Sequence, residues 1–157
     1  MGEIALSQHF TLEEATRSDT AVRLGLDNQP DDATLDAMRA AAEKMELVRQ
    51  LLGNDPLQVT SWYRSPEVDR AVGGTGRSNG HSSGWCIDFR MYEHLPARYR
   101  TPLEICQAIV ASDLRYDQLI WEGTWVHISF HPALRQMQLT AHFKAGAPTT
   151  YTAGIPA

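Results

Sequence analysis

The chain has 157 residues, enough for one well-buried core but few for two, so we expect a single domain over residues 1–157. Its composition, 43% hydrophobic and 21% charged, is that of a globular protein and not of a disordered one. A net charge of −5 argues against a nucleic-acid-binding protein, and no apolar run approaches the roughly 20 residues that insert into a membrane.

The first half of the chain predicts helices followed by a strand. Thr11, with Glu14 three residues later, is typical of the start of a short helix. Apolar residues at three- and four-residue steps predict a long helix over residues 32–52. Residues 57–65 alternate and are rich in Val, Thr and aromatic side chains, which predicts a strand, and one or two helical turns follow over residues 66–72.

The second half predicts a strand, a helix and a hairpin. After a Gly/Ser-rich loop, residues 85–92 form a strand, and residues 101–112 form a helix with a Thr cap and an early Pro. Residues 117–130 contain two apolar runs around Gly-Thr, which predicts a hairpin. The tail, about residues 143–157, has no clear period and is expected to be irregular.

Asp88 lies between Ile87 and Phe89 in the second predicted strand. An ionised carboxylate in an apolar strand costs several kcal/mol unless it is paired or binds a cation, so a cation is the partner to look for. His81 and His127 can complete a three-ligand zinc site with Asp88, which leaves the fourth position that a catalytic zinc needs for water. Zinc is the default ion, although this ligand set also suits manganese, iron or nickel.

The predicted hairpin brings a second carboxylate to this site. A two-residue Gly123-Thr124 loop pairs Glu122 with Trp125 and Ile120 with His127. Glu122 and His127 then project from the same face of the sheet, diagonal to each other. A carboxylate beside a catalytic zinc can take the proton of its water and pass it to a leaving amine, and Glu122 is our candidate for this role.

Arg64 has two interpretations. Most arginines are solvated surface charges. A guanidinium at a strand end near a metal can instead bind a substrate carboxylate or polarise a carbonyl oxygen. The two cysteines are interpreted as buried free thiols, and Cys86 shares its strand face with Asp88.

Four segments of the chain resemble, in order, the blocks of the peptidoglycan-cleaving D-alanyl-D-alanine carboxypeptidase family of zinc peptidases, in its phage-type branch. These segments are HFTLEEATRSDTAVRLGLDNQP, VTSWYRSPEVDRAVGG, SNGHSSGWCIDFR and YDQLIWEGTWVHISF. The resemblance covers about residues 9–131. The family pattern is Ser-x-His-x-x-Gly-x-Ala-x-Asp, followed downstream by Glu and Trp-x-His. This chain departs from it at Asn79, where the pattern has Ser, and at Cys86, where it has Ala.

The resemblance implies a fold and a set of roles. The fold would be α+β, with a small, mainly antiparallel sheet that carries the zinc site and helices packed on it. One Zn²⁺ ion would be bound by His81, Asp88 and His127, with Glu122 as general base and acid and Arg64 binding the substrate and supporting the oxyanion. Substrate contacts are expected from Ser78, Asn79 and Trp125.

The sequence therefore predicts a zinc peptidase that hydrolyses an amide bond in peptidoglycan stem peptides or cross-links, as a phage-type lysin. Two alternatives stay open: a cytoplasmic dipeptidase for D-amino-acid peptides, and a non-hydrolytic zinc-stabilised module that binds cell wall or forms part of a virion. The N-terminus lacks the features of a signal peptide. We expect a monomer that stays in the cytoplasm until release to the wall, or is carried by the virion.

Overall fold

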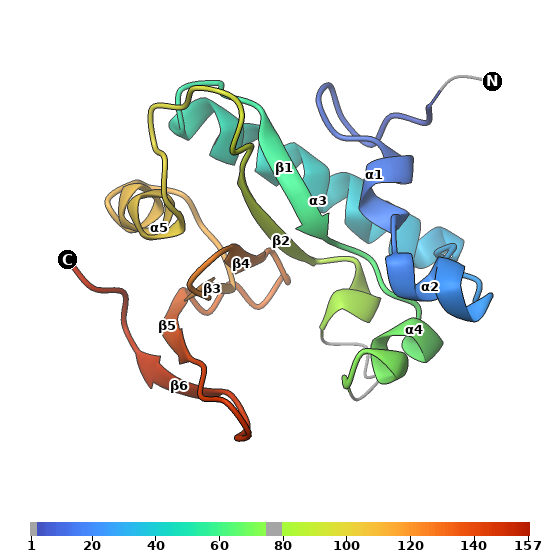
Figure 1. Cartoon of the computed structure of the whole chain (residues 1–157). Coiled ribbons are helices and arrows are strands. Elements are labelled where there is room, and N and C mark those ends of the chain that lie inside the picture. The colour runs from blue at the N-terminus through green and yellow to red at the C-terminus, as the bar shows by residue number, and fades with distance from the viewer. Residues whose placement is uncertain (1–2, 75–79) are drawn as a thin grey trace. The chain divides into compact units, whose positions relative to one another are not determined.

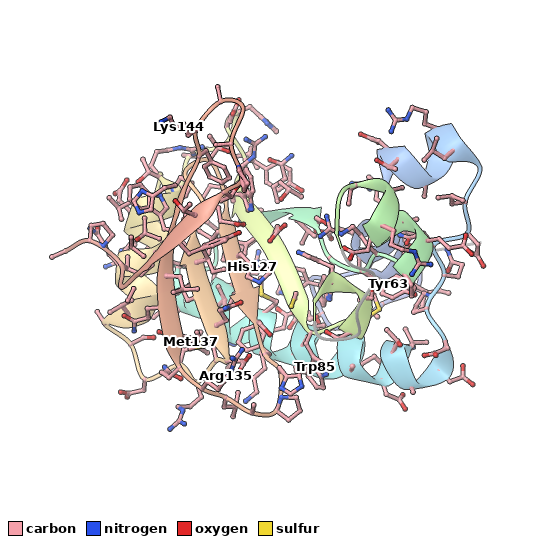
Figure 2. The ribbon with its side chains drawn as sticks, turned by 90° about the horizontal axis from the view of Figure 1, so that it is seen from below. Tyr63, Trp85, His127, Arg135, Met137 and Lys144 are labelled. Carbon is pink, nitrogen blue, oxygen red and sulfur yellow. The ribbon has the colours of Figure 1, made fainter. Side chains whose placement is uncertain are left out.

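A computed structural model describes residues 3–74 and 80–157 (Figure 1). In these residues the helices are α1 (Leu12–Thr16), α2 (Asp19–Leu24), α3 (Asp32–Leu51), α4 (Pro66–Ala71), the short 3-10 helix η1 (His81–Ser83) and α5 (Pro102–Val110). The strands are β1 (Leu57–Ser61), β2 (Cys86–Met91), β3 (Gln118–Trp121), β4 (Val126–Ser129), β5 (Met137–His142) and β6 (Thr150–Ala153). No helix in these two ranges combines the length and apolar character needed to cross a membrane.

The chain divides into two compact units, residues 1–46 with 61–87, and residues 47–60 with 88–157. The first unit contains α1, α2, α4, η1 and most of α3. Its buried side chains include Phe10, Met38 and Trp62, and the ring of Phe10 meets that of Trp62 edge-on at 6.2 Å between centroids. The prediction of a single domain stays a prediction.

The second unit contains α5 and most of a six-stranded sheet of order β1-β2-β4-β3-β5-β6 within the described residues. Strand β3 is antiparallel to β4 and parallel to β5, and β5 is antiparallel to β6. Helix α5 packs against β3 and β4, whose Leu119 and Ile128 are fully buried. The expected α+β class, with a small and mainly antiparallel sheet, is confirmed.

Local signals placed most of the elements correctly. The Thr11 hydroxyl accepts a hydrogen bond from the Glu14 amide at the start of α1, and Thr101 forms a full capping box with Glu104 at the start of α5. These bonds satisfy amide groups that have no partner inside the helix. Strands β1, β2, β3 and β4 lie within the predicted ranges, and both cysteines are buried and free, as expected.

Four elements were not predicted, namely α2, the short helix η1, β5 and β6. Helix α2, capped by Ser18 and ended by Gly25 in the left-handed region (φ +65°), has only six residues, too few to show a helical period. Strand β6 lies inside the 143–157 tail that was expected to be irregular, and this expectation is corrected. All four residues of β6 are exposed, so no buried alternation marks it, and it forms because β5 offers a strand edge.

Candidate metal and catalytic site

His81 is buried at the start of η1, and a main-chain carbonyl fixes its ring. Its Nδ1 lies 2.7 Å from the carbonyl oxygen of Trp62. Because a carbonyl only accepts hydrogen bonds, Nδ1 is the protonated nitrogen and Nε2 carries the lone pair. Histidines that bind metals usually have this arrangement, in which the second nitrogen donates to a carbonyl or carboxylate.

The carbonyl that orients His81 is itself held firmly. The Trp62 side chain is 1% exposed, and its indole N–H donates to the Gly84 carbonyl at 2.8 Å. Gly84 adopts φ +83°, and a Cβ at this position would lie 2.9 Å from Cγ of Met38 and 3.0 Å from the carbonyl of Thr34. Only glycine suits both the backbone angle and the space, which gives a physical reason for the Gly of the pattern.

Asp88 lies in β2 and His127 in β4, and their side chains are in contact. Oδ1 of Asp88 is 2.8 Å from Nδ1 of His127, and both side chains are largely buried. His81, Asp88 and His127 each offer one ligand atom, and these atoms lie within 4.8 Å of one another. The group could hold a metal ion.

The donor set fits zinc. Two imidazoles and one carboxylate are nitrogen and oxygen donors of the kind that zinc prefers, and three protein ligands are typical of a catalytic ion rather than of a closed structural one. Among the residues that the structure describes, this is the one group of three or more His, Cys, Asp or Glu side chains able to hold a metal.

The hairpin places Glu122 as predicted. Ile120 pairs with His127, and the Glu122 amide donates to the Trp125 carbonyl at 3.1 Å. Gly123, in the loop, has φ +76°, a conformation that favours glycine. Directly opposed residues share a face, so Glu122, two residues beyond Ile120, lies on the same face as His127.

Arg64 follows β1 in the first unit and is tied to the segment that carries His81. Its carbonyl accepts a hydrogen bond of 2.7 Å from the Ser82 hydroxyl. Its Nε lies 3.1 Å from Oδ1 of Asp69, a buried residue of α4. The two charges attract each other at this distance, although the Nε–H does not point at Asp69 closely enough to form a hydrogen bond.

The predicted substrate contacts have different outcomes. Ser78 and Asn79 lie outside the described residues. Trp125 lies on the hairpin beside Glu122, and its ring is 5.9 Å from that of Phe143, measured between centroids. Its contact with a substrate stays a prediction.

A protein-family model described as Peptidase M15 matches residues 8–129. The chain belongs to this family. M15 enzymes are zinc peptidases of the D-Ala-D-Ala carboxypeptidase type, so the chain is assigned to the zinc metallopeptidases that act on peptides of the peptidoglycan kind. No protein in a search of curated sequences matches the chain.

The matched M15 region contains Arg64, His81, Asp88, Glu122 and His127, and ends at the last residue of β4. Strands β5 and β6 lie beyond it.

Sequence reasoning missed the residues that support the M15 site. Asp69 could have been found, because the Ser65-Pro66 start of α4 brings a residue of the first helical turn back toward Arg64. No local signal indicates that the Trp62 carbonyl would meet His81, since a main-chain acceptor has no sequence signature.

Proposed function

We propose that this chain is a zinc-dependent peptidase that hydrolyses an amide bond in peptidoglycan stem peptides or cross-links, and that it acts as a lysin of the phage type. The observation that carries the proposal is the position of Glu122 on the same face of the sheet as His127, whose imidazole contacts Asp88. A site that served stability alone would have no need of a second carboxylate on this face. The phage-type role is inferred from the resemblance over residues 9–131.

In this proposal His81, Asp88 and His127 hold one zinc ion. When bound, zinc supplies Lewis acidity toward a peptide carbonyl and toward water. The hydrogen bond from His81 to the Trp62 carbonyl keeps Nε2 directed at the ion and prevents the ring from rotating.

Glu122 is the proton carrier. Its carboxylate takes a proton from the water that attacks the substrate carbonyl carbon, and then delivers this proton to the leaving amine nitrogen. The two steps need one group that stays between the attacking oxygen and the leaving nitrogen. The tight β3–β4 turn suits this need, because it holds the Glu122 backbone by the hydrogen bond to Trp125.

Arg64 is proposed to bind the substrate. A guanidinium that is paired with Asp69 through Nε can donate its other N–H groups to a substrate carboxylate or to the oxygen that gains charge in the tetrahedral intermediate. Ser78, Asn79 and Trp125 are proposed as further substrate contacts. The bond cut would be D-Ala to D-Ala, D-Ala to diaminopimelate, or L-Ala to D-Glu.

The test is the release of new amino groups from purified peptidoglycan by the zinc-loaded wild type and by Glu122→Gln. Glu93→Gln is the matched control, because it makes the same chemical change at a residue beyond β2 whose side chain is 81% exposed. We expect Glu122→Gln to keep its zinc and lose activity by about 100-fold to 10,000-fold, while Glu93→Gln keeps both. Mass spectrometry of the fragments identifies the bond.

Two other results would change the conclusion. Cleavage of small D-amino-acid peptides without cleavage of the wall would favour a dipeptidase. Stoichiometric zinc with no hydrolysis of either substrate would refute the catalytic proposal and leave a zinc-stabilised binding module.

A further inference from the structure

Strand β6 brings a tyrosine into the row of side chains that contains Glu122. Ile120 on β3 is level with Leu139 on β5, so Glu122, two residues on, is level with Ala141. Ala141 is paired with Tyr151 on β6. Paired residues on neighbouring strands share a face of the sheet, so Glu122, Ala141 and Tyr151 form one row on the face of His127.

The middle member of this row is small. Neighbouring strands are about 4.8 Å apart, so the backbones of Glu122 and Tyr151 are separated by about two such spacings. The Ala141 methyl occupies little of the space between them, and a tyrosine is long enough to extend over it. Tyr151 is 50% exposed, so part of the residue faces solvent.

Electrostatics supports this placement. Partial burial and then the negative charges of Glu122 and Asp88 raise the pKa of the Tyr151 phenol. The direction of this shift agrees with the row that Tyr151 shares with Glu122. A tyrosine hydroxyl is protonated at neutral pH even without such a shift, so it is a hydrogen-bond donor here.

The opposite face of the hairpin anchors β6. The Thr140 hydroxyl donates to the Gly154 carbonyl at 2.7 Å, and the Thr152 hydroxyl lies 2.8 Å from Nε2 of His142. The Gly154 amide also donates to the Gln138 carbonyl at 2.7 Å. Hydrogen bonds from both side chains and main chain therefore join the strand that carries Tyr151 to β5.

The same hairpin reaches the site at a second point. The ring of Phe143, directly after β5, lies 5.9 Å from that of Trp125, measured between centroids. Trp125 directly precedes β4 and is paired with Glu122 across the loop. Ala141 and Tyr151 thus extend the Glu122 row and Phe143 lies beside Trp125, although all three residues lie beyond the part of the chain that matches the M15 model.

We propose that Tyr151 is a substrate-binding residue of the peptidase, and that its hydroxyl donates a hydrogen bond to a carbonyl or carboxylate oxygen of the bound peptide beside Glu122. This inference rests on the proposed function. Its chemical basis is that Glu122 and Asp88 accept hydrogen bonds as carboxylates, whereas peptide oxygens need donors.

The experiment compares Tyr151→Phe with Thr152→Val in the zinc-loaded full chain. Thr152→Val is the matched control, because it also removes one hydroxyl from β6, but from the opposite face. With a peptidoglycan-derived peptide as substrate, we expect Tyr151→Phe to raise KM about 10-fold and to change kcat less than about threefold, with unchanged zinc content. Thr152→Val should leave KM at the wild-type value.

An unchanged KM in Tyr151→Phe, or an equal rise in both variants, would overturn the inference. If the wild type hydrolyses no peptide, the proposed function fails, and calorimetric titration with the same peptide tests Tyr151 separately. Binding about 10-fold weaker in Tyr151→Phe alone would then sustain the role of Tyr151. Equal affinities, or no binding to the wild type, would refute it.

Discussion

Two buried carboxylates in the second unit, Asp117 and Asp88, have different partners. Asp117, directly before β3, accepts hydrogen bonds from the backbone amide, Nε and Nη2 of Arg135, at 3.0, 2.9 and 2.8 Å. Asp88, in the middle of β2, is in contact with the imidazole of His127 and lies near that of His81.

The two carboxylates differ in the source of the positive charge that offsets their own negative charge. Arg135 is always charged, so the chain itself neutralises Asp117, and the pair stabilises the start of β3. Imidazoles are mostly neutral at pH 7 and can bind the same ion as a carboxylate, so Asp88 is placed to share a metal with them. Asp117, paired with an arginine, is therefore assigned a structural role, and Asp88, among histidines, a metal site.

The largest expected effect is on activity. Asp88→Asn should reduce hydrolysis and zinc affinity by at least about 100-fold, because a neutral amide is a poorer zinc ligand than a carboxylate. Asp117→Asn should keep the zinc affinity of the wild type. Competition with a chelator measures the zinc affinity of both variants. Equal affinities would refute the assignment of Asp88, and not Asp117, as a metal ligand.

The effect of zinc on stability sharpens the same contrast. At a free zinc concentration about 1,000 times Kd, the metal should add about 4 kcal/mol to the free energy of unfolding of the wild type. Denaturant titrations with zinc and with a chelator measure this gain. It should persist in Asp117→Asn and fall to about 1.4 kcal/mol or less in Asp88→Asn, whose zinc affinity is expected to be at least about 100-fold lower. The full gain of about 4 kcal/mol in Asp88→Asn would show that the ion binds elsewhere.

Asp117 should instead give a pH-dependent contribution to stability. The hydrogen bonds from Arg135 hold the pKa of Asp117 below its usual range, so its stabilisation is complete well above pH 4 and is lost as the pH falls through the lowered pKa. Arg135 is half-exposed, so solvent weakens the pair.

Asp117→Asn should cost about 2 kcal/mol at pH 7, and this difference should narrow below about pH 4. Urea unfolding at both pH values checks this expectation. A difference that does not depend on pH would mean that packing, and not charge, sets the effect.

The smallest effect is expected at Cys86, which is buried in β2 two residues before Asp88. Cys86→Ala, the residue of the family pattern, removes one buried sulfur and should cost about 1 kcal/mol or less. Thermal unfolding measures this change. Zinc affinity should stay the same, and a clear fall would show that the thiol is also a ligand.

The Glu122 position could be predicted because it depends on a short-range rule. A Gly-Thr loop sets the register of its own two strands, so Glu122 and His127 share a face whatever surrounds them. The role of Asp117 could not be predicted in this way, because its partner Arg135 follows a loop after β4, where Leu134 and Gln136 adopt positive φ. Neither residue type indicates this backbone in advance.

The sequence by itself determined which types of side chain are available to bind a metal and which helices Thr11 and Thr101 cap. It also determined the face of the sheet on which Glu122 lies. Each depends on residues a few positions apart, where periodicity and turn geometry act directly. Only the tertiary structure decided that the Trp62 carbonyl orients His81 and that Tyr151 lies in the row of Glu122. Pairing of β3 with β5 and of β5 with β6 depends on which strand edges are available once the sheet is assembled, and no local pattern encodes that choice.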